Sequence, residues 1–210
     1  MEQKKKVYAY FDGSNFYHLA KSNYGITQVK FNHLANQLLL LKSEELVRIR
    51  YFIAPVNQQE SLEKYSAQQK FLNNLIKTPL LDLYLGKLVR RPLKNINILC
   101  PKCGLQTSES LNCPSCGKII KINDVYKSTE KGVDVHLGIS LLLDALENKY
   151  DIALLFSGDA DFCPAIKYIL KNLNKEIIFC HFPIPKTNEL IQCCSDSRPI
   201  TKEMLEKSKV

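Results

Sequence analysis

Short apolar runs that end in aspartate and small residues constrain the fold of this chain more than any other feature. Ile152 to Phe156 is continuously apolar, and Val7 to Phe11 is apolar and aromatic. Runs without polar residues are typical of strands that lie inside a parallel sheet. Asp-Gly-Ser-Asn follows the run at Val7 and Ser-Gly-Asp-Ala-Asp follows the run at Ile152. Each strand is therefore expected to turn directly into a helix.

The rest of the chain alternates between strand and helix patterns. Asn32 is expected to cap a helix, and Thr201 a terminal one. The apolar face of the first of these is Leu34, Leu38 and Leu41. Lys131 to Lys149 is apolar on more than one side, which predicts a heavily buried helix. Other strands are expected at Leu46–Ala54, Leu80–Arg91 and Glu176–His181, and other helices at Phe16–Lys21, Gln58–Lys77 and Phe162–Leu173. This alternation predicts a parallel sheet with helices on both faces and right-handed crossovers.

Length and charge favour one domain with a polyanionic partner. The 210 residues suffice for one core, so one domain over residues 1–210 is expected, interrupted by a cysteine-rich insert at residues 97–121. The net charge is +8, and the segment from Lys77 to Lys131 holds ten basic and four acidic residues, or +6 of that total. An excess of this kind favours nucleic acid, although a solvated lysine-rich face is the alternative.

The amino terminus predicts a cytoplasmic protein. Its basic run is followed by only a short apolar stretch that ends at Asp12, so no secretory signal is expected. No stretch approaches the ~18 apolar residues of a membrane span, and no membrane partner is expected. In a reducing compartment the eight cysteines are expected to be metal ligands or core thiols rather than disulfides.

Four aspartates occupy equivalent positions beside the predicted strands and helices. Asp12 follows the first strand, Asp134 begins the apolar helix, and Asp159 and Asp161 follow the run at Ile152. In a parallel sheet all four project from one edge. Carboxylates that converge repel one another unless a cation lies among them, and hard oxygen ligands select Mg²⁺ or Mn²⁺. Any one of these acids has an alternative role as a helix cap or turn residue.

Three motifs resemble those of the NYN domain family, which belongs to the PIN-like nuclease superfamily. The motifs are Tyr-Phe-Asp-Gly-Ser-Asn-Phe, Lys-Gly-Val-Asp-Val-His-Leu and Leu-Phe-Ser-Gly-Asp-Ala-Asp-Phe. The resemblance implies a three-layer, Rossmann-like α/β/α sandwich and metal-dependent hydrolysis of RNA phosphodiester bonds. It also implies metal-site roles for Asp12, Asp134, Asp159 and Asp161. Asp12 and Asp159 are expected to be the leading ligands, and Asp134 a further ligand or a residue that orients water.

The implied reaction assigns roles to neighbouring polar residues. Asn15 and Ser157 are expected to hold water or phosphate by hydrogen bonds. Lys131 is expected to meet the scissile phosphate, and a solvated lysine at the helix end is the alternative. The result is an Mg²⁺- or Mn²⁺-dependent endoribonuclease for RNA processing or turnover.

Two other functions are weighed against this one. The first is a non-catalytic RNA-binding or adaptor protein on the same fold, against which the complete set of aspartates argues. The second is a hydrolase of small phosphoesters, whose first strand carries Asp-x-Asp where this chain has Asp12-Gly-Ser-Asn15.

Two matched Cys-Pro-x-Cys-Gly motifs predict a structural zinc ribbon in the insert. Tetrahedral Zn²⁺ takes four thiolates, here Cys100, Cys103, Cys113 and Cys116. A rubredoxin-like iron site or a redox pair is the alternative. The other cysteines lack this spacing; those beside apolar segments are expected to be core thiols, and the pair Cys193-Cys194 has no explanation.

Basic residues around the insert suggest an arm that grips RNA. Phosphate contacts would come from the flanking basic residues, and Tyr84 and Tyr126 would stack on bases. The basic residues are Arg90, Arg91, Lys94, Lys118 and Lys121, together with Lys131. The alternative is that the ribbon docks a protein partner or a second copy of the chain.

We predict that purified protein holds about one zinc per chain, because four thiolates complete one tetrahedral shell. Elemental analysis after metal-replete expression measures this content. A protein with neither zinc nor iron would contradict the assignment.

Overall fold

The computed structural model describes residues 3–40, 42–56, 58, 61–92, 98–99, 106–107, 111–112, 116, 119–120, 126–184 and 187–210. The chain divides into two compact units. The first consists of Met1–Lys87 and Gly132–Val210, and the second of Leu88–Lys131.

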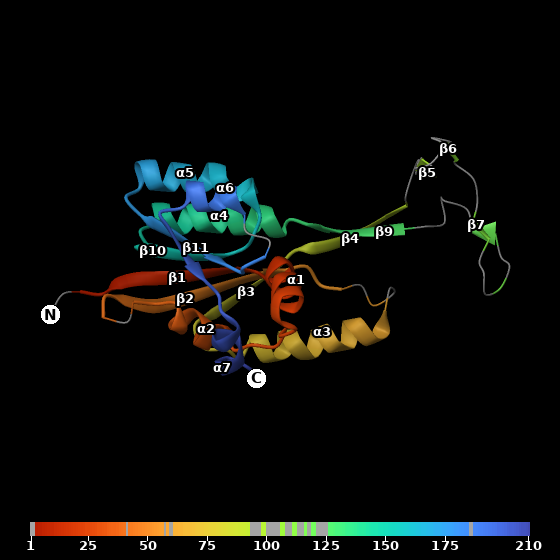
Figure 1. Cartoon of the computed structure of the whole chain (residues 1–210), viewed down its shortest axis with the longest axis horizontal. Helices are drawn as coiled ribbons and strands as arrows, with labels where there is room; N and C mark the ends of the chain where they lie inside the picture. Colours follow the sequence, from red (N-terminus) through yellow and green to blue (C-terminus); the bar gives the residue numbers. More distant parts are fainter. Residues whose placement is uncertain are drawn as a thin grey trace. The chain divides into compact units, whose positions relative to one another are not determined.

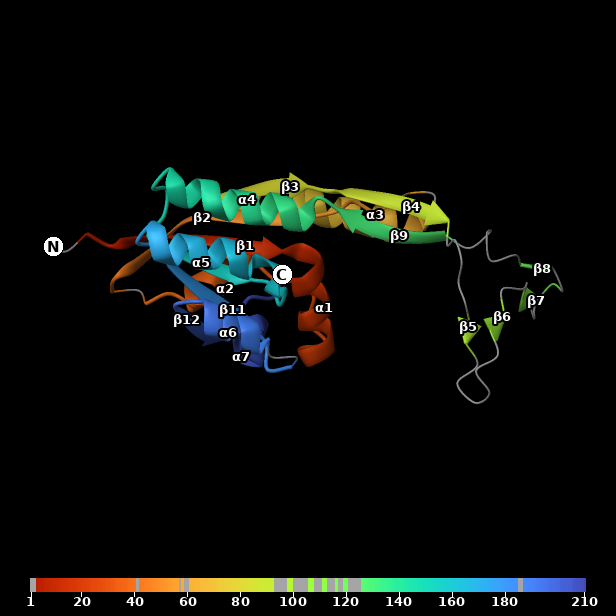
Figure 2. The ribbon, with the colours of Figure 1, turned by 90° about the horizontal axis from the view of Figure 1, so that it is seen from above.

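Six parallel strands form the central sheet of the first unit, in the order β12-β11-β10-β1-β2-β3 (Figure 1 and Figure 2). They are β1 (Lys5–Asp12), β2 (Glu44–Ile53), β3 (Leu81–Leu85), β10 (Ile152–Phe156), β11 (Glu176–His181) and β12 (Asp196–Pro199). The strands after β1 are added on one side of it, whereas β10 lies on its other side and is followed by β11 and β12. The direction of strand addition thus reverses between β1 and β10.

Helices cover both faces of this sheet, which confirms the expected three-layer α/β/α fold with a parallel sheet (Figure 1). One face carries α1 (Gly13–Tyr24), α2 (Phe31–Gln37), α3 (Leu62–Leu75) and α7 (Lys202–Lys207). The other carries α4 (Val133–Leu146), α5 (Cys163–Asn172) and α6 (Asn188–Cys193). No helix among the described residues is long and apolar enough to cross a membrane.

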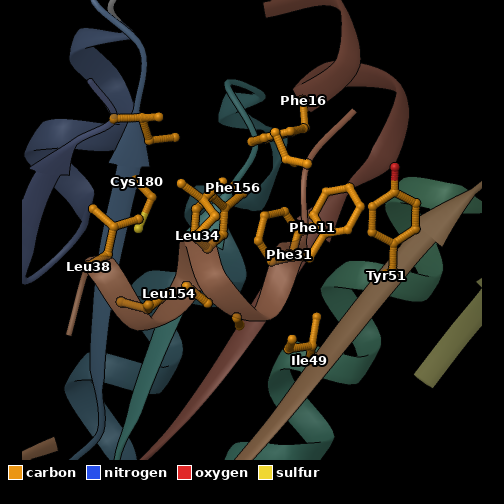
Figure 3. Packing of buried hydrophobic residues seen from close by; sticks show 14 of the residues in the cluster. Phe11, Phe16, Phe31, Leu34, Leu38, Ile49, Tyr51, Leu154, Phe156 and Cys180 are labelled. Carbon is orange, nitrogen blue, oxygen red and sulfur yellow. The ribbon is translucent and has the colours of Figure 1, made fainter. Parts of the chain in front are cut away.

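Each strand of the sheet contributes to two cores because side chains alternate between its faces. In β1, Ala9 and Phe11 enter the core under α1 and α2, while Tyr8 and Tyr10 enter the core under α4 and α5. Figure 3 shows the first of these cores, where the rings of Phe11 and Phe156 stack with centroids 3.9 Å apart. Burial of such a ring stabilises the fold by about 1.5–3 kcal/mol.

Most predicted elements are confirmed, with shifted ends. Thr201 caps α7 by accepting the N–H of Met204. Asn32, however, lies inside α2, and the N-cap of that helix is Lys30, whose side chain makes no capping bond. The helix predicted from Gln58 starts only at Leu62, because Ser61 accepts the N–H of Lys64 as its cap. Leu41 lies outside the described residues.

The strand expected from Leu80 to Arg91 is two strands. β3 ends at Leu85, and after Gly86 the chain continues as β4 (Lys87–Pro92). β3 pairs with β2 in the central sheet, whereas β4 pairs with β9 (Tyr126–Lys131). An apolar run alone does not distinguish one long strand from two that join different sheets.

The prediction that α4 is heavily buried is wrong. Its inner residues are buried, but Val135, Ile139, Leu143 and Leu146 are about half exposed. Periodicity identified both apolar faces of the helix, and the described residues cover only one of them.

Short strands in the second unit flank the cysteine motifs. β5 (Ile98–Leu99) pairs antiparallel with β6 (Gln106–Thr107), and β7 (Leu111–Asn112) with β8 (Ile119–Ile120). Each pair encloses one Cys-Pro-x-Cys-Gly motif. Cys116 is exposed, while Cys100, Cys103 and Cys113 lie outside the described residues. The zinc ribbon therefore stays a prediction.

Candidate functional site

The candidate site lies where β1 and β10 end side by side. Phe11 and Phe156 are paired across these parallel strands, and Asp12 and Ser157 are the next residues along the chain. Strand addition reverses at this point, and open α/β sheets bind ligands outside the carboxyl ends of the strands at such a reversal.

Asp12 is a buried carboxylate with two fixed hydrogen bonds. The residue as a whole is only 5% exposed. Oδ1 accepts the backbone N–H of Asn15 at 3.1 Å, and Oδ2 accepts the hydroxyl of Ser157 at 3.0 Å. Asp12 is thus the N-cap of α1. A helix cap was the alternative to metal ligation in the sequence analysis. Capping and ligation are compatible, because each carboxylate oxygen has more than one lone pair.

Ser157 donates its hydroxyl to the Asp12 carboxylate, whereas the sequence led us to expect a contact with water or phosphate. The residue is 2% exposed, so a substrate does not reach its hydroxyl. Besides donating to Asp12, Oγ accepts the N–H of Asp159 at 3.2 Å. One buried hydroxyl therefore links the two strand ends that carry these aspartates.

Asn15 and Thr187 hold the turn at Gly158. The Gly158 N–H donates to Oδ1 of Asn15 at 2.9 Å, and the Thr187 hydroxyl donates to the Gly158 carbonyl at 2.9 Å. Sequence reasoning missed Thr187. It precedes α6 at the N-cap position but makes no capping bond, so its sequence context indicates a helix start and not a role at the site.

Asp159 and Asp161 lie close enough to Asp134 to oppose its negative charge. Asp159 caps the 3₁₀ turn Ala160–Phe162 by accepting the N–H of Asp161 at 2.9 Å. Asp134 lies in the first turn of α4. Partial burial raises the pKa of Asp134, and the negative charges of Asp159 and Asp161 raise it further. Asp134 is therefore affected by the negative charges of Asp159 and Asp161, while metal ligation by the four aspartates stays a prediction.

These carboxylates are the donor set that Mg²⁺ or Mn²⁺ prefers. In the part of the chain that the structure describes, no three acidic, histidine or cysteine side chains are already gathered as a metal shell. Like charges stay apart when no cation lies between them. In chemical type, these oxygen donors fit a divalent cation.

The basic residues assigned to RNA belong to the second unit. Arg90, Arg91 and Lys131 are exposed there. Lys94, Lys118 and Lys121 lie outside the described residues.

We predict that Asp161→Asn lowers the pKa of Asp134, because one of the two charges that raise it disappears. The measurement is a ¹³C NMR titration of the Asp134 carboxyl carbon. Asp196→Asn is the matched control, since Asp196 is exposed at the amino end of β12. An Asp134 pKa that is the same in the Asp161 variant and the parent would mean that these carboxylates do not interact.

Comparisons with known proteins agree with this architecture. The NYN domain family model matches residues 6–201. A crystal structure of a protein of unknown function from Vibrio parahaemolyticus superimposes with a TM-score of 0.59 at 16% sequence identity, covering 97% of this chain and 98% of that one. At this identity the likeness concerns the fold alone. No curated protein matches the chain. Because the family model spans nearly its whole length, the chain belongs to the NYN domain family.

Proposed function

We propose that this NYN domain is a divalent-metal-dependent ribonuclease that hydrolyses internal phosphodiester bonds of RNA. The observation that carries the proposal is the carboxylate cluster at the strand reversal. The Ser157 hydroxyl donates to the Asp12 carboxylate and accepts the backbone N–H of Asp159. Partial burial raises the pKa of Asp134, and its acidic neighbours raise it further. Membership of a family of nuclease-like domains supports the same reading.

Asp12 and Asp159 are proposed as the leading ligands of Mg²⁺ or Mn²⁺, with Asp134 and Asp161 completing the donor set. A bound ion would lower the pKa of a coordinated water and neutralise charge that develops on the phosphoryl oxygens. The residues themselves supply fixed geometry. Asp12 is held by hydrogen bonds at both oxygens, so its orientation is set before any ligand arrives.

Asn15 and Lys131 are proposed to contact the substrate. Oδ1 of Asn15 already accepts the Gly158 N–H, which leaves the Nδ2 amide to donate to water or to a phosphate oxygen. Lys131 precedes the Gly132 cap of α4 in sequence and would meet the scissile phosphate as a point charge.

The basic residues that flank the cysteine motifs of the second unit are proposed to bind RNA. Arg90, Arg91, Lys94, Lys118 and Lys121 would contact phosphates. A Zn²⁺ ion held by the four cysteines of the two motifs would stiffen the segment, because so small an insert buries little apolar surface. The paired strands around each motif are compatible with such a ribbon.

We predict that RNA cleavage requires Mg²⁺ or Mn²⁺ and stops in chelator. Asp12→Asn and Asp159→Asn should each lose at least about a hundredfold in cleavage rate, because an amide keeps the shape but removes the charge that binds metal. The assay compares RNA, DNA and a small phosphoester under single-turnover conditions.

Asp196→Asn serves as the control and should cleave like the parent. If both folded site variants retain full activity, the carboxylate cluster is not the catalytic site. Cleavage of the small phosphoester alone would favour the phosphatase reading, and tight RNA binding without cleavage would favour the adaptor.

We also predict that RNA affinity and the rate of cleavage can be changed separately. Replacing Arg90, Arg91 and Lys94 together by Ala should weaken RNA binding and flatten its dependence on salt, by about 0.7 in slope for each lost phosphate contact on a single strand. The cleavage rate at saturating RNA should fall much less than the affinity, as expected when uniform binding is lost.

The matched control replaces three exposed lysines near the carboxyl terminus, Lys202, Lys207 and Lys209, by Ala. Equal salt slopes in parent, test and control would assign the basic residues of the second unit to a protein partner or to solvent.

A further inference from the structure

The outer face of α4 is an apolar surface that the first unit leaves uncovered. Val135, Ile139, Leu143 and Leu146 are 61%, 51%, 47% and 51% exposed. Together with the partly buried Leu142 they form the outer stripe. At 100° per residue these five positions lie opposite the buried face of the helix. The buried face consists of Val133, Leu137, Leu141, Asp144 and Ala145.

The outer stripe differs from the single exposed apolar residues found elsewhere on the described surface. No other described helix or strand carries more than one exposed large apolar residue, whereas α4 carries four of them in a row along one line. A helix that is apolar on opposite faces is normally covered on both. Contiguous apolar surface of this kind marks an interaction site.

We propose that the outer stripe binds the same stripe of a second copy, with the two α4 helices antiparallel about a two-fold axis. The residue spacing favours this occupant. Val135 and Leu146 are eleven residues apart, about three helical turns, so they share one line on the helix. A two-fold axis halfway along the stripe places Val135 of one copy next to Leu146 of the other.

Polar residues on one flank of the stripe fit the same symmetry. His136 and Glu147 are also eleven residues apart, and both are exposed on the same side of the stripe. In the antiparallel pair the His136 imidazole of each copy lies beside the Glu147 carboxylate of the other. The imidazole can donate a hydrogen bond to the carboxylate, and the symmetry gives two such contacts in each dimer. Glu147 forms an ion pair with Lys149 of its own chain, which leaves further lone pairs on the carboxylate.

The opposite flank is closed by the chain itself. A Cβ at Gly138 would meet the Phe162 ring at 3.7 Å, and α5 runs beside α4 in both views (Figure 1 and Figure 2). A second helix therefore approaches over the outer stripe and along the side that carries His136 and Glu147.

The expected dimer is weak. A helix of 14 residues is about 21 Å long, and two such helices in contact bury an area at the low end of specific interfaces. Opposed helix dipoles favour the antiparallel order. We expect a dissociation constant on the order of micromolar. If the proposed function also holds, the two copies of Asp134 stand at opposite ends of the helix pair, so each site keeps its own substrate.

Sedimentation velocity of the full chain across a concentration series tests the dimer independently of nuclease activity. The sedimentation coefficient should rise from monomer to dimer with concentration. Ile139→Glu and Leu143→Glu should each weaken association at least about tenfold, because a charge would be buried at the interface. Leu62→Glu is the matched control: Leu62 is 63% exposed on α3, on the other side of the sheet, and association should not change. Circular dichroism melting verifies that each variant folds.

A charge exchange tests the antiparallel order. His136→Glu and Glu147→Lys should each weaken the dimer, because like charges or donors then face one another. The double variant should restore it, since the carboxylate introduced on one copy would then face the ammonium group introduced on the other. A monomer at every concentration overturns the proposal, whether the stripe is covered by the insert or by another protein. A dimer that tolerates both stripe variants lies on another surface, and failure of the double variant to restore association overturns the antiparallel pairing.

Discussion

The parallel pairing of β1 with β10 is the constraint on which the rest of the structure depends. Residues 145 positions apart in sequence become neighbours, so that the Ser157 hydroxyl reaches Oδ2 of Asp12 at 3.0 Å. The pairing is held by side chains on both faces of the strands: the rings of Phe11 and Phe156 stack on one face, and Tyr10 and Leu155 are buried on the other. An acid that follows a strand buried in this way cannot move far from its neighbour. The sheet therefore fixes the position of Asp12 relative to Ser157.

A buried ion pair fixes α4 over this sheet and so positions the third part of the site. Asp144 of α4 lies with Oδ2 at 2.5 Å from Nε of Arg50 on β2, and it accepts the Tyr10 hydroxyl at 2.7 Å. Burial raises the pKa of Tyr10 well above its usual range, with a further contribution from the charge of Asp144, so the phenol remains a donor. Loss of one partner from a buried pair costs about 3–5 kcal/mol because the other charge stays desolvated. Sliding α4 along the sheet would break these contacts. The first turn of the helix, with Asp134, is thereby held at the carboxyl edge.

The sequence predicted the strands more successfully than it predicted the burial of α4 or the hydrogen bonds of Ser157 and Thr187. Val7–Phe11 and Ile152–Phe156 are strands because their apolar and aromatic runs are buried on both faces of the sheet, and such runs are recognisable in the sequence itself. The hydrogen bonds of Ser157 and Thr187 could not be predicted from the sequence, since a hydroxyl group can cap a helix, stabilise a turn or orient a carboxylate. α6 and β12 were missed because both are short and carry polar residues. The exposure of Val135 and Ile139 was missed for a different reason: periodicity reports which faces of a helix are apolar, but not whether a neighbour covers each of them.

α4 connects these observations because three parts of its surface have different roles. The inner face packs on the sheet, the first turn carries Asp134 near other acids, and the outer stripe is proposed to pair with a second copy. Partial burial and the charges of Asp159 and Asp161 oppose the charged form of Asp134, and the contacts of Asp144 hold in place the helix that carries it. The anchoring also makes the outer stripe rigid, so a partner that binds it meets a surface already ordered, at little cost in conformational entropy. The features that restrain the proposed metal ligand and those that favour association thus have a common origin in the packing of one helix.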